Sequence, residues 1–209
     1  MYTGITRGTF KVTALDRSDD LLTYSVAVTP ELALGIQIGA SVSIDGVCQT
    51  VVAIDGNALE FEAIRETLDL TTLGSLELGQ KVAVERSSRV GDEVGGHDVA
   101  GHVIGTGRID SVHRIGHVCD LRVAVPRAWM KYILEKGFIA IDGSSLTVGK
   151  TDPVGAFDLH LIPETLRLTN LGERAVGDRV NIELDARTVA IVDTVERVLE
   201  ERRQAEEQS

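Results

Sequence analysis

The chain carries two copies of one sequence pattern. Residues 44–51 read IDGVCQTV and residues 141–148 read IDGSSLTV, so the second copy follows the first by 97 residues, as from Asp45 to Asp142. Residues 65–74 (RETLDLTTLG) return in the same way as residues 163–172 (PETLRLTNLG). This period is the length of a domain and far exceeds the roughly 20–50 residues of a solenoid repeat. The sequence therefore predicts two similar domains, and two similar pockets for any chemistry.

Length and charge restrict the class of protein. The 209 residues divide into two domains of about 95 residues plus a tail, and each domain is large enough to bury its own core. A net charge of −11 without any Lys/Arg cluster argues against a nucleic-acid partner. The sequence has neither a long apolar run nor the features of a signal peptide, so we expect no membrane segment. The two cysteines, Cys48 and Cys119, stand at different places in the two copies, and free thiols fit a reducing cytoplasm.

Short runs of alternating apolar and polar residues predict β-structure. Residues 58–63 (ALEFEA), 82–85 (VAVE) and 180–183 (VNIE) have the period of two that is typical of strands. Asp55 and Gly56 predict a tight hairpin turn. Each copy has room for about six such strands, which favours a small closed barrel.

Three helices are expected. One begins at Pro30 and covers residues 30–32, and another begins at Pro126 and covers residues 126–134, since proline suits the first turn of a helix. A longer one covers residues 188–204, with apolar residues at Val189, Val192, Val195, Val198 and Leu199. Its apolar stripe either packs on its own domain or joins copies of the chain. The expected domains are 1–97, 98–187 and a helix with its tail at 188–209.

Cys48 and Ser145 occupy equivalent positions in the two copies, each two residues before a threonine, Thr50 or Thr147. Residues two apart in a strand share a face, so each pair is expected to line one pocket. The alternative is that Cys48 is a small buried residue that packs as a hydrophobe. The serine in the second copy weighs against this alternative, because a buried hydroxyl needs a hydrogen-bond partner.

Two histidines stand at the start of the second copy. His97 and His102 lie five residues apart, on opposite faces of a strand, and no ligand-like spacing surrounds them, so we predict no metal site. Either histidine also fits an ordinary half-buried side chain. His102 follows Gly101, and glycine lets a ligand approach the backbone closely. His102 is therefore a candidate proton acceptor near neutral pH.

A Glu-Thr pair recurs in both copies, as Glu66-Thr67 and Glu164-Thr165. One interpretation is an ordinary turn at the end of a strand. The other is that the pair holds the same ligand group twice. The GTG at residues 105–107 does not extend to a dinucleotide or phosphate-loop fingerprint, so neither kind of nucleotide site is predicted.

Five motifs in order resemble the riboflavin synthase family of the α-chain type: MYTGI (1–5), DGVCQTV (45–51), GGHDVAGH (95–102), GFIAIDGSSLTV (137–148) and LIPETL (161–166). The resemblance extends to about Leu199. It implies an all-β chain of two tandem six-stranded Greek-key β-barrels with short helices, plus a C-terminal amphipathic helix that joins subunits into a homotrimer.

The resemblance also implies a reaction. Two molecules of 6,7-dimethyl-8-ribityllumazine exchange a four-carbon unit, which gives riboflavin and 5-amino-6-ribitylamino-2,4(1H,3H)-pyrimidinedione, without cofactor or metal. Two identical substrates held face to face explain two similar pockets in one chain. In the family, the N-terminal barrel of one subunit faces the C-terminal barrel of its neighbour. Both the lumazine and riboflavin are expected ligands, and association with lumazine synthase is possible although no residue indicates it.

The resemblance assigns site residues by matching motif. The first-copy pocket would comprise Gly4, Ile5, Thr6, Cys48, Gln49, Thr50, Glu62, Ala63, Ile64, Arg65, Glu66 and Thr67. The second-copy pocket would comprise Gly101, His102, Val103, Lys136, Ser145, Leu146, Thr147, Ile162, Pro163, Glu164, Thr165, Leu166 and Arg167. Main-chain amides are expected to read the pyrimidinedione edge, and Glu66 and Glu164 to bind ribityl hydroxyls. The residues expected in catalysis are Ser41, Cys48, His102, Ser145, Thr147 and Asp185.

The chain departs from the family pattern at two positions. Tyr2 stands where the family usually has phenylalanine, and little loss is expected because the ring is kept. Gln49 is polar where the family commonly has an apolar residue, which could alter the first pocket. The alternative function is a non-catalytic lumazine- or flavin-binding carrier, as in luminous bacteria. Such carriers typically lose one pocket, whereas both copies here keep their Glu-Thr pair.

Overall fold

The computed structural model describes residues 1–207, and the first copy forms a closed β-barrel. Its strands are β1 (Thr9–Arg17), β2 (Leu21–Ala27), β3 (Ser41–Ile44), β4 (Val47–Asp55), β5 (Ala58–Ile64) and β6 (Lys81–Arg86). Around the barrel they follow the order β1-β2-β5-β4-β3-β6, with antiparallel neighbours. Because β2 pairs with β5 and not with β3, the connection is a Greek key. We call this the N-barrel.

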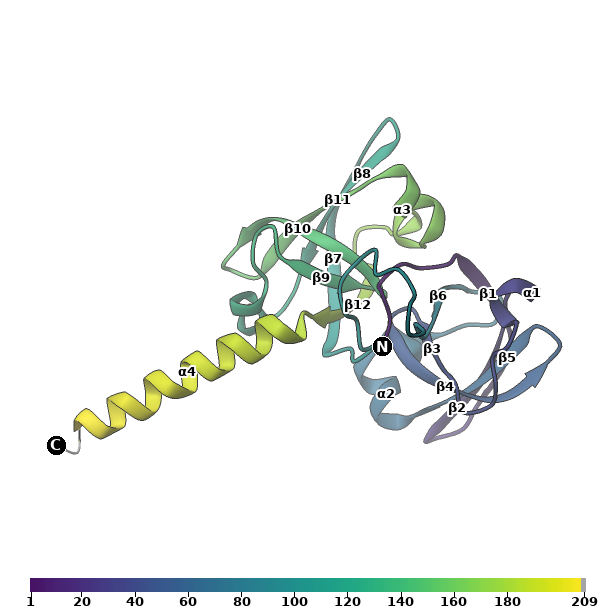
Figure 1. The fold of residues 1–209 in the computed structure, drawn as a ribbon. Coiled ribbons are helices and arrows are strands. Elements are labelled where there is room, and N and C mark those ends of the chain that lie inside the picture. Colours follow the sequence, from purple (N-terminus) through teal and green to yellow (C-terminus); the bar gives the residue numbers. More distant parts are fainter. Residues whose placement is uncertain (208–209) are drawn as a thin grey trace.

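The second copy forms a barrel of the same design, the C-barrel. Its strands are β7 (Gly105–Ile115), β8 (Val118–Ala124), β9 (Phe138–Ile141), β10 (Ser144–Asp152), β11 (Ala156–Leu161) and β12 (Arg179–Leu184). Read from β7, the order around the barrel is β7-β8-β11-β10-β9-β12, which repeats the order of the N-barrel. The register shift between Val12 and Ala14 in β1 also returns between Ile109 and Ser111 in β7. The prediction of two tandem six-stranded barrels is confirmed (Figure 1).

Each barrel has its own apolar core. In β2, for example, Leu22, Tyr24 and Val26 are buried and the residues between them are only partly covered. This alternation follows from the period of two in a strand, which directs every second side chain inward. The predicted hairpin is also present, as Gly56 and Asn57 form the turn between β4 and β5.

Of the two helices expected at prolines, the first is present and the second is shorter than the sequence suggested. Pro30 opens α1 (Pro30–Ala33), where the Thr29 hydroxyl accepts a hydrogen bond from the Leu32 N–H. Pro126 precedes η2 (Arg127–Tyr132), which is a 3-10 helix. Residues 133 and 134, which were predicted to be helical, lie beyond its end.

Two further helices were not predicted from the sequence. They are α2 (Arg65–Leu70) and α3 (Pro163–Leu168), each followed by a 3-10 segment, η1 (Thr72–Ser75) or η3 (Leu171–Glu173). The Glu-Thr pairs lie in the first turns of α2 and α3, so each segment after the strand is a short helix and not a plain turn. Helices of six residues are too short to show a helical period in the sequence.

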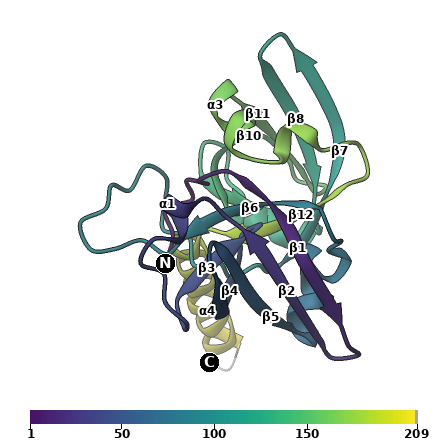
Figure 2. The same ribbon diagram turned by 90° about the vertical axis from the view of Figure 1, so that its right-hand side faces the viewer.

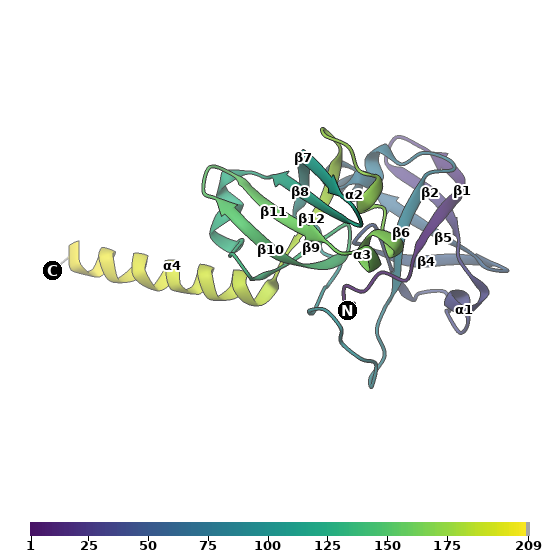
Figure 3. The ribbon, with the colours of Figure 1, turned by 90° about the horizontal axis from the view of Figure 1, so that it is seen from above.

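The C-terminal helix α4 (Ala186–Glu207) leaves the C-barrel and points away from both barrels as a rod (Figures 1 and 3). Near its start Val189 packs on the C-barrel core, and the Tyr132 hydroxyl donates to Asp193 Oδ1 at 2.5 Å. Farther along, Val195 and Leu199 are 51% and 59% exposed. The first turns thus pack on their own domain, whereas the rest of the stripe is uncovered. No helix within residues 1–207 has the apolar length to cross a membrane.

The two barrels meet through equivalent parts of the repeat, and β6 and β12 run through the middle of the molecule (Figure 2). Gly46 and Gly143 touch: a Cβ on Gly46 would lie 2.4 Å from the nitrogen of Gly143. Asn181 links the barrels, since its Nδ2 donates to the Asp45 carbonyl at 2.7 Å. Contacts between equivalent residues show that an approximate twofold relation joins the barrels.

A pair of carboxylates is buried at this interface. Asp45 and Asp142 are each 1% exposed and stand at equivalent positions. Asp45 Oδ1 accepts from the Ala83 N–H, and Asp142 Oδ2 pairs with Arg174 at 2.6 Å. Burial and the nearby charge of Asp142 raise the pKa of Asp45 to about 7. Sequence reasoning gave these residues no role.

Candidate functional site

Two extended segments, residues 2–6 and residues 99–103, cross between the barrels, one from each copy. We call them the crossing segments. Tyr2 and Val99 are repeat equivalents and pair with each other in antiparallel fashion. The Tyr2 N–H donates to the Val99 carbonyl at 2.7 Å, and the Val99 N–H donates back at 3.1 Å. The N-terminus accordingly lies between the barrels (Figure 1). From this contact each segment continues along the barrel of the other copy.

Two glycines allow the crossing segments to lie close to the barrels. Gly101 lies against β4 of the N-barrel, where its carbonyl accepts from the Cys48 N–H at 2.9 Å. Gly4 lies against β10 of the C-barrel, where its carbonyl accepts from the Ser145 N–H at 2.8 Å. A Cβ at Gly101 would lie 2.7 Å from Cys48 Cβ, and one at Gly4 would lie 2.5 Å from Ser145 Cβ. Both glycines also have φ above +70°, so only glycine permits these contacts without strain.

The division of residues between the two pockets is therefore the reverse of the expectation for the crossing segments. Residues 4–6 lie against the C-barrel, where the Gly4 carbonyl accepts from the Ser145 N–H and Thr6 Oγ1 lies 3.0 Å from Ser144 Oγ. Residues 101–103 complete the N-barrel pocket, since Val103 packs into the N-barrel core. The sequence pattern could not distinguish these arrangements, because both copies carry similar segments before their first strands.

Two equivalent carboxylates hold the crossing segments. Glu85 at the end of β6 accepts from the Thr3 N–H at 2.8 Å and from its hydroxyl at 2.7 Å. Glu183 in β12 accepts from the N–H groups of Ala100 and Gly101 at 2.7 and 2.9 Å. Burial raises the pKa of both carboxyls. Sequence reasoning missed this role, although the repeated VAVE and VNIE motifs end on these residues.

The N-barrel pocket is a cavity of about 280 Å³. It is lined by Val47, Cys48, Glu66, Thr67, Leu70, Thr71, Gly101, His102 and Val103. The structure thus brings together the thiol of Cys48, the exposed imidazole of His102 and the first turn of α2. Within residues 1–207 the Glu66 carboxylate has neither an ion pair nor a hydrogen bond. This arrangement offers a nucleophile, a base and a free carboxylate around one cavity.

Cys48 is held from two sides. The Tyr2 hydroxyl donates to its sulfur at 3.2 Å, and Gln49 Nε2 donates to its carbonyl at 3.0 Å. Gln49 is buried inside the barrel, where its Oε1 accepts from the Tyr24 hydroxyl at 3.3 Å. The side chains of Gln49 and Ala63 belong to the barrel interior, because their strand positions direct them inward. Neither side chain lines the cavity.

The remaining residues predicted for this pocket lie along its strand ends. Thr50 is exposed on the same side of β4 as Cys48, and Ser41 on β3 pairs with Thr50. Glu62, Ile64 and Arg65 are exposed where β5 passes into α2. None of these side chains lines the cavity that holds Cys48 and His102.

The equivalent position in the C-barrel has different partners. Ser145 Oγ lies 2.6 Å from Nδ1 of His97, whose ring stacks on Phe138 with centroids 5.1 Å apart. Burial lowers the pKa of His97, so its ring is held neutral. His97 is therefore a buried histidine with a satisfied hydrogen bond, which agrees with its interpretation as an ordinary structural side chain. Its partner Ser145 could not be identified from the sequence, because 48 residues separate the two.

The carboxylate of α3 is engaged, unlike that of α2. Arg167 Nε and Nη2 donate to the two oxygens of Glu164 at 2.9 and 2.5 Å. The repeat places Asp69 where Arg167 stands, so Glu66 has no such partner. Lys136 is exposed with a left-handed φ of 66°. Of the other predicted residues, Ile162 and Pro163 stand at the start of α3 and Thr165 lies within it, and Leu146 and Leu166 pack against the C-barrel core.

Asp185 is the cap of α4. Its Oδ2 accepts from the Thr188 N–H at 2.9 Å and from the Thr188 hydroxyl at 2.6 Å. Burial opposes ionisation, but these hydrogen bonds outweigh it and lower the pKa of Asp185. Thr147 is exposed on β10 opposite Phe138. Asp185 and Thr147 therefore lie apart from the lining of the N-barrel cavity.

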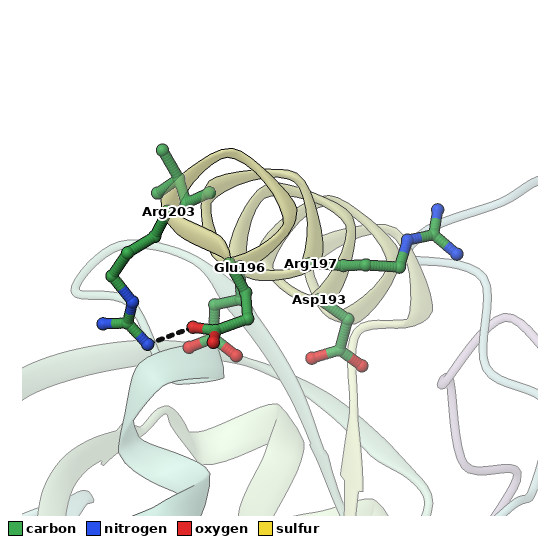
Figure 4. Close-up of a pocket in the computed structure, with 6 residues that line it drawn as sticks. Asp193, Glu196, Arg197 and Arg203 are labelled. Atoms are coloured by element: carbon green, nitrogen blue, oxygen red, sulfur yellow. Dashed lines mark hydrogen bonds and ion pairs between the residues drawn. The ribbon is translucent and has the colours of Figure 1, made fainter. Parts of the chain in front are cut away.

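A hollow along α4 contains none of these residues. It measures about 700 Å³ and is lined entirely by α4, with Asp193, Glu196, Arg197 and Arg203 among its residues (Figure 4). Its walls are mainly charged, unlike the mostly apolar walls of small-molecule sites. Within residues 1–207 no group of three or more His, Cys, Asp or Glu side chains could hold a metal ion.

Comparison with known proteins gives one family. Residues 3–87 and 100–185 both match the lumazine binding domain, one match for each barrel. The chain is 45% identical over 206 residues to the riboflavin synthase of Escherichia coli (strain K12), which covers 98% of this chain and 96% of the relative. It is 38% identical over 199 residues to the riboflavin synthase of Chlamydia pneumoniae, with 95% and 97% covered.

Solved structures share the fold at lower identity. LumP complexed with riboflavin has a TM-score of 0.82 and 23% identity, and the match covers 88% of this chain and 100% of that chain. LumP complexed with 6,7-dimethyl-8-(1'-D-ribityl) lumazine has a TM-score of 0.80 and 22% identity, with 88% and 99% covered. These likenesses agree with two barrels in tandem.

Proposed function

The chain belongs to the riboflavin synthase family, and from this premise we propose how its two pockets divide the reaction. Two molecules of 6,7-dimethyl-8-ribityllumazine react, and a four-carbon unit passes from one to the other. The products are riboflavin and 5-amino-6-ribitylamino-2,4(1H,3H)-pyrimidinedione. The observation that carries the proposal is the doubled barrel: both barrels have the same strand order, yet Cys48 stands in one and Ser145 at the equivalent position of the other.

Each pocket binds one lumazine in this proposal. Main-chain groups of β4 and of residues 101–103 contact the pyrimidinedione edge in the N-barrel, and β10 with residues 4–6 does so in the C-barrel. The free carboxylate of Glu66 accepts hydrogen bonds from ribityl hydroxyls, since an ionised carboxylate is a strong acceptor. Glu164 does the same in the C-barrel, beside Arg167.

The chemistry needs a base and an activated acceptor. The 7-methyl protons of a lumazine are acidic because the resulting anion delocalises into the ring, so a modest base suffices. We assign this proton to the His102 imidazole, assisted by Thr147 of the facing pocket. Cys48 polarises or attacks the acceptor lumazine. Ser41, Ser145 and Asp185 are assigned supporting roles around the facing substrates.

The two facing pockets come from different subunits of a homotrimer in this proposal. The exposed part of α4 supports the assignment, since Ile191, Val195 and Leu199 are more than half exposed on a helix that leaves the body of the chain. An apolar stripe of this kind is stabilised by packing against copies of itself. The free thiols of Cys48 and Cys119 fit a cytoplasmic location.

The alternative is a lumazine or flavin carrier without activity. It is weaker, because the carrier-like structures are 22–23% identical to the chain whereas the synthases are 38–45% identical. The two functions are separated by one assay. Purified protein is mixed with the lumazine alone, and riboflavin formation is followed by absorbance. A synthase forms riboflavin catalytically, and His102→Gln is expected to lose most of this activity between about pH 6 and 8. A protein that binds the lumazine but forms no riboflavin is a carrier.

A further inference from the structure

The sulfur of Cys48 has a specific hydrogen-bond donor. The hydroxyl of Tyr2 lies 3.2 Å from Cys48 Sγ, within the range for a hydrogen bond to sulfur. Tyr2 is 2% exposed, and both of its main-chain groups are paired with Val99. The Cys48 backbone is fixed in turn by the Gly101 carbonyl. Donor and acceptor are therefore both placed by the crossing segments, so the contact is built into the fold.

The direction of this hydrogen bond is defined by the surroundings of the phenol. Burial, followed by the hydrogen bond to Cys48, raises the pKa of Tyr2 well above its usual range. The carboxyls of Glu85 and Glu183 act in the same direction. The phenol therefore stays protonated at working pH and donates. An O–H donor binds an anionic sulfur more strongly than a neutral thiol, because hydrogen bonds to ions are the stronger class.

We propose that Tyr2 is a positioning residue for Cys48: its hydroxyl orients the sulfur at the wall of the N-barrel pocket and stabilises the thiolate. The proposal rests on the proposed function only where it concerns turnover, through the role given to Cys48. The hydrogen bond and its effect on the thiolate can be measured without turnover.

Within residues 1–207, the C-barrel has no hydrogen bond equivalent to the one between Tyr2 and Cys48. The repeat equivalent of Tyr2 is Val99, which has no hydroxyl, and Ser145 is paired instead with the neutral ring of His97 at 2.6 Å. The donor to position 48 thus belongs to one pocket alone, the one that holds the thiol. This asymmetry fits a role tied to sulfur and not a general need to fill the space at the crossing.

The test is the pH profile of thiol alkylation in the full-length protein. Iodoacetamide rates are measured from about pH 6 to 9.5 in a Cys119→Ala background, so that Cys48 is the single thiol. Tyr2→Phe keeps the ring and removes the hydroxyl. Its alkylation rate at about pH 7 is expected to be roughly fivefold lower relative to its own high-pH plateau, as the loss of one hydrogen bond of about 1 kcal/mol gives. Normalising to the plateau removes any change in access to the sulfur.

The matched control is Tyr24→Phe. It removes another buried phenol hydroxyl of the N-barrel, one that donates to Gln49 and not to Cys48. Its alkylation profile is expected to stay that of the wild type, even if both variants lose similar thermal stability. A Tyr2→Phe profile that coincides with the wild type, or that is matched by Tyr24→Phe, overturns the proposal.

Turnover measured on the same samples separates the proposal from the proposed function. A shifted profile with lower kcat and little change in KM supports both. A shifted profile with unchanged kcat supports Tyr2 as the positioning residue and contradicts the role of Cys48 in the reaction.

Discussion

The N-barrel and the C-barrel share one backbone and differ in the side chains that face their pockets. Strand order and ladder irregularities repeat, and each crossing segment is held by an equivalent glutamate, Glu85 or Glu183. The surroundings of the equivalent residues differ, because Cys48 lines a cavity together with His102, whereas Ser145 contacts His97. The repeat therefore explains why the chain can hold the same ligand twice, and the differences explain how two identical substrates can be treated unequally.

The crossing segments couple the two pockets. Gly101 lies against the N-barrel and Gly4 against the C-barrel, so each crossing segment contacts the barrel of the other copy. In the proposed function, neither barrel therefore carries a whole site within its own strands. The expected domain boundary between residues 97 and 98 therefore divides the two copies in the sequence but does not divide the two proposed sites. A change in one crossing segment should damage the pocket of the opposite barrel.

The largest effect is expected at the crossing glycines. Gly101→Ala places a Cβ 2.7 Å from Cys48 Cβ at a φ of +79°, so the segment must move away from the N-barrel pocket. Activity is expected to fall about 100-fold, as displacements of about 1 Å cause in active sites. Gly4→Ala should do the same through the C-barrel pocket, with ligand binding retained in the N-barrel. Steady-state rates and ligand titrations measure both effects.

Gly39→Ala is the matched control, because Gly39 has a φ of +88° with no atom within 4 Å of a Cβ. It shares the backbone strain but not the collision. Equal losses of activity in all three glycine variants would show that strain alone is responsible.

Removal of the exposed part of α4 is expected to have the next largest effect. A chain that ends at residue 194 keeps the Asp185 cap and the packing of Val189 but loses Val195, Val198 and Leu199. The barrels should stay folded while the pockets of different subunits separate, with a loss of activity of about 30-fold from lost positioning. Light scattering measures the mass. A truncated chain that remains trimeric contradicts the role given to the stripe.

Exchange of the pocket nucleophiles should have a smaller effect. Cys48→Ser makes the N-barrel resemble the C-barrel and is expected to lower kcat about tenfold with nearly intact binding, since serine is the weaker nucleophile at neutral pH. Ser145→Cys is the converse variant and should lose less. Equal effects of the two exchanges in kcat would mean that the pockets do not divide the chemistry.

The smallest effect is expected at the buried interface and concerns stability. The pKa of Asp45 is raised from 3.8 to about 7, so its protonated form stabilises the folded state. This stabilisation is complete below the ordinary pKa and is lost as pH rises through about 7. Asp45→Asn should therefore gain thermal stability over the wild type as pH rises from about 4 to 8. The exposed Asp110→Asn serves as control, and a constant difference between Asp45→Asn and wild type would contradict the assignment.

The parts predicted from the sequence are those with local or repeated signals. The repeat and its alternating runs predicted two barrels, the Asp55-Gly56 pair predicted a hairpin, and the spacing of valines predicted most of α4. Cys48, Glu66 and Thr67 were expected in the first-copy pocket and line one cavity, whereas His102, which was expected in the second-copy pocket, lines the same cavity.

What could not be predicted depends on contacts between distant residues. The exchange of segments has no sequence signal, since similar residues precede both barrels. The partners of Glu85 and Glu183 are main-chain groups about 80 residues away, at separations of 82 and 83. The pairing of Glu164 with Arg167 is local in the sequence. It shows a difference between the copies only when it is compared with Glu66, which has no arginine three residues later.

The central claim is that each site joins the N-barrel pocket of one chain to the unlike C-barrel pocket of another. It is tested by mixing Cys48→Ser, damaged in the N-barrel pocket, with Gly4→Ala, damaged in the C-barrel pocket. After subunits exchange, a site is intact only where a Gly4→Ala chain supplies the N-barrel pocket and a Cys48→Ser chain supplies the C-barrel pocket. The account predicts recovery to about one quarter of wild-type activity in an equal mixture. Activity that stays at the mean of the two separate variants, although mixed oligomers have formed, would contradict it.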